Sequence, residues 1–464
     1  MKKVLGLVLI LVALCFIPAS IGEAAKATTK SYTITTKSVP SKSFTKMSTY
    51  NKYTKHYYVF RDILEDCEKN GGGNITVKKG TYTITNVLCI PSNVTLTLED
   101  GVTIKKGTQT GTDKFGISKS IFQLIKPSKL KSSKYYSKYN GEKNIKIIGK
   151  GDATIDLQSL QSSIGIILGH NQNVSISGIT FKNLNMGHFI EMDASKDVTV
   201  KDCSFLESIE SPKHNKEAIN IDTPDPLTGG FNCAWSAQDK TPNLNVTIDN
   251  CTFKNIDCAV GTHRYSQEQD EDGKYTINVY HTNIKITHSR FYGIRSYVFD
   301  IINWKDVEIS DCEISGGSYL KETKRTLSSG ELYEDSRILY NTVLRLKGID
   351  NFTFKNNTCS DVGSISATTY ITATSSDYNA LYTDLEFKLT VDNVKDLIFN
   401  NTYTDVINNW IDTCPLKPGS IIEDASYSKY IKYGAPNTPS DYIAIYVGLN
   451  YWTLAEARAA EKNQ

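Results

Sequence analysis

The sequence predicts an all-β protein: a single-stranded right-handed parallel β-helix with an N-terminal capping helix and long loop insertions. A short phrase recurs from residue 144 to residue 399, and many of its copies start about 24 residues apart or about twice that. The segments between the copies alternate apolar and polar residues over a few positions. One turn of a three-sided β-helix needs about that many residues, and its strands pair with the next turn about 4.8 Å away.

Each copy of the phrase starts with Asn or Asp, continues with alternating apolar residues and is often followed by Phe. The copies start at Asn144, Asn173, Asp197, Asn245, Asn283, Asp306, Asn351 and Asp396. Equivalent positions in successive repeats must stack, so the phrase sets the register between strands that long insertions separate. Helical repeats are excluded because helical periodicity is lacking, and propeller blades because they need about 40 or more residues.

The chain divides into four segments. Residues 1–25 have the charged start, apolar stretch and small residues of a secretory signal peptide. Residues 26–55, rich in Thr, Ser and Lys, predict a loosely ordered linker. The β-helix is expected over 56–405, and 406–464 is expected to cap or pack along its C-terminal end.

The β-helix should begin with a short amphipathic helix that covers its open end. Phe60, Ile63, Leu64 and Cys67 have helical spacing, and three glycines from Gly71 end the run. Alternating segments follow at once. The long insertions predict loops outside the solenoid, at 106–143, 223–243, 264–282 and 315–340.

Composition predicts an extracellular protein, free or attached to the cell surface. The formal net charge is only +2, from 52 basic and 50 acidic residues, which argues against nucleic acid as a partner. Beyond the signal peptide no apolar run is long enough for a membrane span. We expect a monomer.

The cysteines predict small buried side chains more than a disulfide framework. Ten minus Cys15 of the signal peptide leaves nine, an odd number that cannot all pair within one chain. Cys203, Cys251 and Cys312 each lie six positions after a repeat's Asn or Asp, as interior residues would. One or more disulfides is the alternative. No spacing predicts a metal site, so we expect none.

The strand before each Asn or Asp should lie on one continuous sheet. Its apolar residues point inward, so the polar ones should share an exposed outer face. Five successive turns place the following residues there: Glu191, Asp193, Asn220, Asp222, His263, Asp300, Arg345 and Lys347. Asp225 and Arg264 follow just beyond strand ends. The cluster is functional or is the ordinary polar exterior of a soluble β-helix.

The distances expected from strand geometry suit this cluster to glycoside hydrolysis. The Glu191–Asp222 diagonal should be roughly 8 Å, inside the window of about 6.5–9.5 Å for inverting glycoside hydrolysis. Asp193 and Asp222, about 5 Å apart, should raise one pKa and create a proton donor. His263 would orient or relay, Arg345 and Lys347 would bind a substrate carboxylate, and Asn220, Asp225, Arg264 and Asp300 would bind substrate.

The sequence makes weaker predictions for several other residues outside this cluster. Trp235 in the insertion 223–243 suits stacking on a sugar ring, or is simply a buried tryptophan. Residues 267–273 are acidic and predict a solvated turn, with calcium binding as the alternative. The remaining candidates are expected to be corner or structural residues: Glu217, His214, His170, His188, His281 and His288.

Over roughly residues 55–405 the chain resembles the pectin lyase-like β-helix superfamily. Gly73–Tyr82 resembles the first β-segment common in that superfamily, and Asn144–Gly151 is similar to early strands of polygalacturonases. That family cleaves α-linked uronate chains by inversion, with aspartates on two adjacent turns, then a His and an Arg-x-Lys pair. Asp193, Asp222, His263 and Arg345-Leu346-Lys347 match that order, although Asn-Thr-Asp, Asp-Asp and Gly-His-Gly are absent.

Three functions follow as hypotheses. The first is a secreted glycoside hydrolase acting on an acidic, pectin-like polysaccharide without a cofactor, with Asp222 as proton donor and Asp193 or Glu191 activating water. The second is a calcium-dependent polysaccharide lyase with Lys347 or Arg345 as base. The third is a non-catalytic surface adhesin or glycan-binding solenoid, because fold alone does not fix function.

Overall fold

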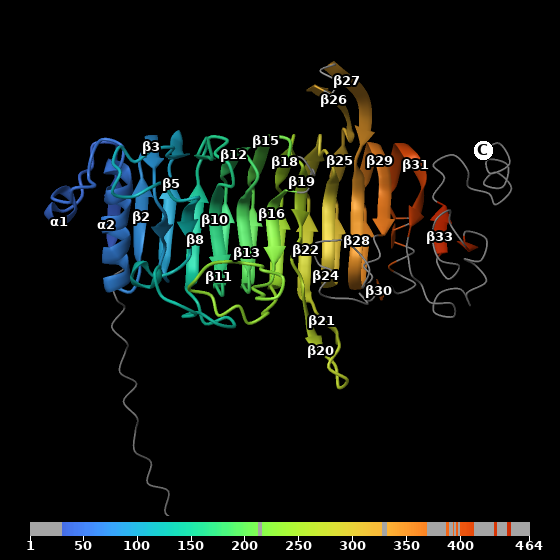
Figure 1. Ribbon diagram of the computed structural model, residues 1–464, viewed down its shortest axis with the longest axis horizontal. Coiled ribbons are helices and arrows are strands. Elements are labelled where there is room, and N and C mark those ends of the chain that lie inside the picture. Colours follow the sequence, from blue (N-terminus) through green and yellow to red (C-terminus); the bar gives the residue numbers. More distant parts are fainter. Residues whose placement is uncertain are drawn as a thin grey trace, which may run out of the picture.

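The computed structural model confirms a right-handed parallel β-helix, seen as a long row of stacked strands (Figure 1). The structure describes residues 30–211, 216–326, 332–368, 387–388, 393, 396–397, 400–412, 431–433 and 443–446. The predicted signal peptide, His214 and most of the segment 406–464 lie outside these residues. Among the described residues, no helix has the length and apolar character to cross a membrane.

Three faces run along the solenoid, and each turn adds a strand to each face. The first face consists of β4 (Leu88–Cys89), β7 (Ser120–Gln123), β10 (Ile164–Gly169), β13 (His188–Asp193), β16 (Glu217–Asp222), β19 (Cys258–Gly261) and the starts of β24 (Tyr297–Ser310) and β28 (Thr342–Lys355). The second face consists of β1 (Ser31–Ile34), β2 (Gly73–Val77), β5 (Val94–Leu98), β8 (Lys143–Gly149), β11 (Gln172–Ser177), β14 (Lys196–Lys201), β17 (Leu244–Asp249), β22 (His281–Thr287) and the ends of β24 and β28, which β30 (Phe387–Lys388) extends.

The third face completes each turn. It consists of β3 (Gly80–Ile84), β6 (Val102–Lys106), β9 (Thr154–Asp156), β12 (Thr180–Leu184), β15 (Ser204–Ser208), β18 (Thr252–Lys254), β23 (Arg290–Tyr292), β25 (Glu313–Ser315), β29 (Thr358–Thr368) and β31 (Thr402–Asp412). Antiparallel pairing joins β31 to β33 (Ile443–Tyr446), and β33 to β32 (Ile431–Tyr433).

The N-terminal end is covered by a helix, as predicted (Figure 1). Helix α2 (Lys55–Lys69) buries Phe60, Leu64 and Cys67, and the short α1 (Lys42–Thr45) precedes it. The linker prediction for 26–55 is wrong in part, because β1 pairs in parallel with β2. An early strand hidden in a Thr-rich stretch therefore extends the second face.

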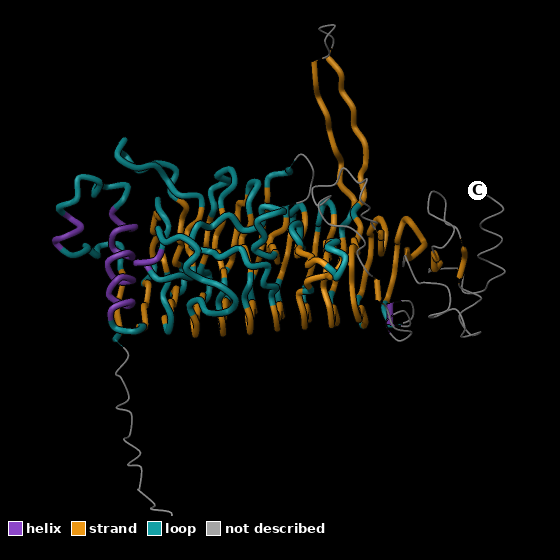
Figure 2. The backbone as a smooth tube through the Cα atoms, turned by 60° about the horizontal axis from the view of Figure 1, so that its bottom comes forward, coloured by secondary structure: helices purple, strands orange, loops and turns teal. Residues whose placement is uncertain are grey.

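The four insertions take different forms. Two are antiparallel hairpins: β20 (Ser266–Gln269) with β21 (Tyr275–Val279), and β26 (Ser318–Thr326) with β27 (Leu332–Tyr340). The second hairpin projects far from the solenoid (Figure 2). The insertion 106–143 contains β7, which belongs to the first face, and the 3₁₀ helix η1 (Pro127–Lys129).

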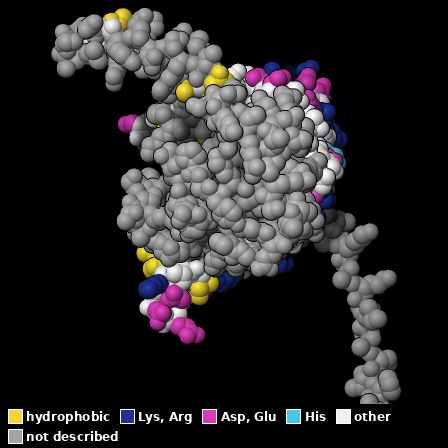
Figure 3. Space-filling view, turned by 90° about the vertical axis from the view of Figure 1, so that its right-hand side faces the viewer, with side chains coloured by type: hydrophobic (Ala, Val, Ile, Leu, Met, Phe, Trp, Pro, Cys, Tyr) yellow, Lys and Arg dark blue, Asp and Glu magenta, His cyan; other side chains and the backbone are white. Residues whose placement is uncertain are grey.

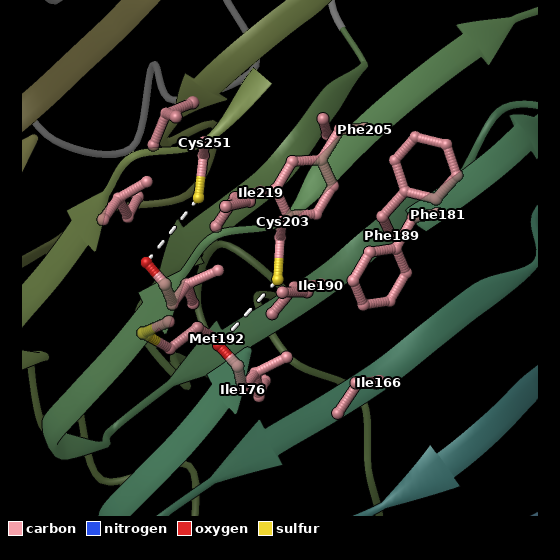
Figure 4. Close-up of a cluster of buried hydrophobic side chains, with 14 of the residues drawn as sticks. Ile166, Ile176, Phe181, Phe189, Ile190, Met192, Cys203, Phe205, Ile219 and Cys251 are labelled. Atoms are coloured by element: carbon pink, nitrogen blue, oxygen red, sulfur yellow. Dashed lines mark hydrogen bonds between the residues drawn. The ribbon is translucent and has the colours of Figure 1, made fainter. Parts of the chain in front are cut away.

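The interior is a set of stacked apolar rows. Phenylalanines of the third face form one row, with ring centroids 5.0, 4.7 and 4.9 Å apart along Phe181, Phe205, Phe253 and Phe291. Cys203 and Cys251 are buried as predicted, and their thiols point at backbone carbonyls (Figure 4). The eight cysteines among the described residues carry free thiols.

The recurring Asn or Asp has a physical reason. These residues adopt left-handed backbone conformations, which Asn and Asp tolerate better than other non-glycine residues. Their φ angles lie between 51° and 61° at Asn93, Asn144, Asn173, Asp197, Asn245, Asn283, Asp306 and Asn351. We call this set the asparagine ladder, because amides of successive turns bond one another, as Asn173 Nδ2 does to Asn144 Oδ1 at 2.8 Å.

The outer surface carries both signs of charge. The view from the C-terminal end shows acidic and basic side chains interspersed along the described rim (Figure 3). This agrees with the formal net charge of +2. Local chemistry therefore has to come from particular clusters, not from the field of the whole molecule.

Candidate functional site

The predicted register of the first face is confirmed. The stacked pairs are Glu191 with Asn220, Asp193 with Asp222, Asn220 with Gly261, Gly261 with Asp300, and Asp300 with Arg345. Lys347 lies opposite Ile302. The repeat phrase therefore aligned these strands correctly across insertions of 20 residues or so.

The prediction that this face is exposed is wrong. The buried members are Asp193, Asn220, Asp222, Asp225, Asp300 and Lys347. Glu191, Arg345 and His263 keep some exposure, at 12%, 17% and 29% of their side chains. Both sides of the first face are therefore shielded from water: the inner one by the core and the outer one largely by loops (Figure 2).

Two loops, 124–142 and 223–243, cover the outer side of the first face and contact each other. We call them the cover. The backbone N–H of Tyr136 donates to the carbonyl of Trp235 at 2.9 Å, and their rings meet edge to face. Phe231 and Trp235 approach the sheet at Gly169, where an added Cβ would lie 2.6 Å from each ring. Trp235 is buried, so its predicted role in sugar stacking is not supported; it packs the cover.

A pocket of about 420 Å³ remains beside the cover. The residues that matter for its chemistry are His188, Glu191, Asp222, His263, Arg264 and Phe231. Its apolar part comes from Phe231 and isoleucines of the first face. Asp193, Arg345 and Lys347 are not among its lining residues. Four of the predicted site residues thus line one pocket: Glu191, Asp222, His263 and Arg264. The other predicted site residues do not line it.

Asp222 holds the chain that carries His263. Its Oδ1 accepts hydrogen bonds from the backbone N–H groups of His263 and Arg264, both at 3.0 Å. Its Oδ2 lies 3.4 Å from His263 Nδ1. Burial raises the pKa of Asp222, and the His263 charge opposes that rise. Asp222 is therefore a positioning group with both oxygens engaged.

Of the two carboxyl groups that line the pocket, Glu191 is the more exposed, at 12% of its side chain against 1% for Asp222. Asn220 bridges it to His263: the Asn220 Nδ2 donates to Glu191 Oε1 at 3.3 Å, and Asn220 Oδ1 lies 3.2 Å from His263 Nδ1. Burial, followed by the nearby Asp222 charge, raises the pKa of Glu191 to about 7. Near neutral pH it is therefore partly protonated.

Asp193 is sealed beneath the cover. It has no exposed surface, and neither carboxyl oxygen has a hydrogen-bond partner among the described residues. Burial, then the charges of Glu191 and Asp222, raises its pKa well above the usual value. A neutral carboxyl group at this depth cannot meet a ligand in the pocket.

His188 and Glu217 were predicted to be a structural and a corner residue, but both lie beside His263. Strict alternation would point both inward with Ile190 and Ile219. Instead the strands bend: Phe189 and Ile190 both enter the core, as do Ala218 and Ile219, so the preceding residue faces outward. Pairs of adjacent apolar residues at the same repeat position were the signal for this bend.

His188, Glu217 and His263 meet on this outer side. Glu217 Oε2 lies 3.7 Å from His188 Nδ1 and 3.5 Å from His263 Nδ1. Burial alone would raise the pKa of Glu217, but the His263 charge lowers it to about 2. Burial would lower the pKa of His263, but Asp222 and Glu217 raise it to about 9; burial lowers that of His188 to about 4.

The sequence predicted no metal site, and the structure places three side chains of ligand type close together. One ligand atom from each of His188, Glu217 and His263 lies within 4.8 Å of the other two. Two imidazoles and a carboxylate are a donor set that zinc accepts.

The basic pair predicted to bind a carboxylate is differently placed. Arg345 donates to both oxygens of Asp300, from Nε at 2.7 Å and from Nη2, and its guanidinium lies 4.0 Å from the centre of the Tyr297 ring. Lys347 is buried. Asp225 Oδ1 accepts the backbone N–H of Leu227 at 2.7 Å and shapes the loop 223–243.

Comparison with known proteins places the chain among β-helix proteins, and no protein-family model matches it. It is 28% identical over 246 residues to the plasmin and fibronectin-binding protein A of Streptococcus pneumoniae, a match covering 48% of this chain and 33% of the relative. The chain thus matches about a third of the length of that curated protein.

Solved structures agree on the fold. The structure of the Streptococcus pneumoniae surface protein and adhesin PfbA matches with a TM-score of 0.52 at 18% identity, covering 76% of this chain and 82% of that one. A family 28 exopolygalacturonase of Yersinia enterocolitica matches with a TM-score of 0.41 at 13% identity, covering 75% and 62%. The similarity to PfbA concerns the fold and not the site.

Proposed function

We propose that this protein is an extracellular, surface-type β-helix that binds a glycan in the pocket of the first face without cleaving it. The pocket volume of about 420 Å³ lies within the range of roughly 300–1,000 Å³ usual for small-ligand sites. Phe231 supplies an apolar surface, and Glu191, His263 and Arg264 supply polar groups at its edge. Sugars present the same combination of apolar ring face and polar rim.

One observation favours binding over hydrolysis: the pocket has one accessible carboxyl group, not two. Hydrolysis needs an acid and a second carboxylate that both face the scissile bond. Glu191 is suited to be one of these two groups. Asp222 is not free to be the other, because its oxygens are engaged by backbone N–H groups and His263. Asp193 is buried under the cover.

The relative supports the same class of function. The pneumococcal protein is named for binding plasmin and fibronectin, and the solved PfbA structure is described as that of a surface protein and adhesin. We infer a surface location and a binding role for this chain from that similarity. The glycan specificity is inferred from the pocket.

Hydrolysis is the second candidate, on a specific observation. Glu191 and Asp222 line one pocket from adjacent turns, on the diagonal that the sequence analysis proposed for acid and base. A lyase finds less support, because Arg345 and Lys347 are not among the lining residues. Movement of Asp222 away from its backbone donors would be required before hydrolysis.

A glycan array followed by product analysis tests both candidates. The full chain should be retained on particular glycans and should release neither reducing ends nor unsaturated products. Glu191→Gln should weaken retention about tenfold, roughly the value of one charged hydrogen bond. Glu313→Gln, an exposed glutamate on the third face, is the matched control and should bind as the wild type does.

Two outcomes would contradict the proposal. If the wild-type protein retains no glycan on the array, the pocket is not a glycan-binding site. Release of reducing ends that stops in both Glu191→Gln and Asp222→Asn would establish the hydrolase instead.

A further inference from the structure

The geometry points to a metal site that the glycan-binding proposal does not use. Three side chains meet on the outer side of the first face: His188 and Glu217 from the starts of β13 and β16, and His263 from just after the end of β19. One nitrogen of each imidazole and one Glu217 oxygen lie mutually within 4.8 Å. The two imidazole rings are nearly parallel, at 22°, with centroids 5.6 Å apart.

Glu217 provides an independent observation. Its side chain has no exposed surface, and neither oxygen makes a hydrogen bond among the described residues. Glu217 Oε2 lies 3.5 Å from His263 Nδ1 and 3.7 Å from His188 Nδ1, which is longer than a normal hydrogen bond. A buried carboxylate without donors costs stability unless an ion or a charged partner compensates it.

The surroundings orient each imidazole. His188 Nδ1 lies 2.7 Å from the carbonyl oxygen of Glu217, which can only accept, so Nδ1 carries the proton. The ligand atom is therefore Nε2, which keeps its lone pair and lies 3.5 Å from Glu191 Oε2. Histidine ligands of metals usually donate their other N–H to such a carbonyl. Asp222 fixes the backbone of His263.

Space at the site is also prepared. An added Cβ at Gly261 would lie 3.2 Å from Glu217 Cγ and 2.8 Å from Asp300 Cβ, so glycine leaves room for the glutamate. His188 and His263 also line the pocket. An ion held there would have protein ligands on one side and an opening to solvent on the other.

We propose that His188, Glu217 and His263 bind one divalent transition-metal ion of the zinc class, with an open coordination position toward the pocket. Two imidazoles and one carboxylate with an open position are typical of such sites. Bonds of about 2.1 Å place tetrahedral ligand atoms about 3.4 Å apart, so binding requires the three side chains to close by roughly 1 Å.

Zinc alone is the probe. The full chain, freed of metal by a chelator and returned to buffer, is titrated with Zn²⁺ by calorimetry. We expect one equivalent to bind. Glu217→Gln and His188→Asn should weaken binding about 100-fold or more, whereas His288→Asn, a change in a surface histidine beside Asp249, should leave it unchanged.

X-ray absorption of the zinc-loaded wild type avoids dependence on variants that fail to fold. Two imidazole ligands and no sulphur are expected. Absence of zinc uptake by the wild type overturns the inference and leaves protonated His263 as the cation between Glu217 and Asp222. Sulphur ligation also overturns it, since Cys233 lines the same pocket. Glycan retention by the metal-free protein is measured separately, so the two proposals can fail independently.

Discussion

The asparagine ladder and the first face use the same repeat geometry with opposite results. In the ladder, the side chains lie near water, and from Asn144 onward each asparagine donates to the ladder residue of the preceding turn, as Asn283 does to Asn245 at 2.8 Å. On the first face, stacking brings acidic groups together where water is excluded. We call Glu191, Asp193, Glu217 and Asp222 the acidic row. Within the part of the chain that the structure describes, the side chains of Asp193 and Glu217 have no hydrogen-bond partner. A ladder stabilises the solenoid, whereas the acidic row costs stability, which is typical of residues kept for function.

The largest expected effect comes from breaking a stabilising stack. Phe205 lies between Phe181 and Phe253, with ring centroids 5.0 and 4.7 Å away. Phe205→Ala should lower the free energy of unfolding by about 3–5 kcal/mol through the cavity it leaves. Urea unfolding followed by circular dichroism measures the loss.

Phe205→Leu is the matched control. It keeps most of the apolar volume and loses only ring stacking, so its cost should be clearly smaller. Equal losses in the two variants would mean that ring stacking, and not the filled volume, stabilises this row.

A substitution in the acidic row should have the opposite effect and raise the free energy of unfolding. Asp193→Asn removes a buried carboxyl group while keeping its shape, and should raise the free energy of unfolding at pH 7. The gain should be on the order of a few kcal/mol, because the wild type has to take up a proton at Asp193 when it folds at pH 7 and the amide does not. Chemical unfolding of wild type and variant at one pH measures it.

The pH dependence follows from the raised pKa of Asp193. Between the ordinary value near 3.8 and the higher folded value, the folded protein binds the proton more tightly than the unfolded chain. This contribution to stability is complete below pH 3.8 or so and is lost as pH rises through the folded pKa. The advantage of Asp193→Asn should therefore be small near pH 4 and grow toward neutrality; an advantage that shrinks with pH would contradict the burial of a neutral carboxyl group.

Much of the fold was predictable because stacking is local and repetitive. The phrase that starts at Asn144 or Asn173 marks a left-handed corner, and every strand pairing of the acidic row follows from that register. The helix over α2 followed from its apolar spacing and the glycines after it. The strand β1 was missed because its apolar positions are few.

The site was harder to predict because it depends on two non-local features. Exposure depends on loops 124–142 and 223–243 folding over the face, which no strand pattern encodes. The side to which Glu217 points depends on a bend that lets Ala218 and Ile219 both enter the core. Strict alternation therefore left Glu217 out, although Glu217 lies about as near His263 Nδ1 as Asp222 does, at 3.5 and 3.4 Å.

The smallest change in the free energy of unfolding should come from substituting a single residue of the asparagine ladder. Asn245 has a φ of 56° and both donates to Asp197 and accepts from Asn283 at 2.8 Å. Asn245→Ala loses both bonds and strains the backbone, and should cost about 1–2 kcal/mol. Asn245→Gly loses the same bonds but accepts a positive φ without strain, so it should cost less. Urea unfolding of the two variants separates the causes: a glycine variant as unstable as the alanine one would show that the amide bonds, and not the left-handed corner, are what the repeated asparagine contributes.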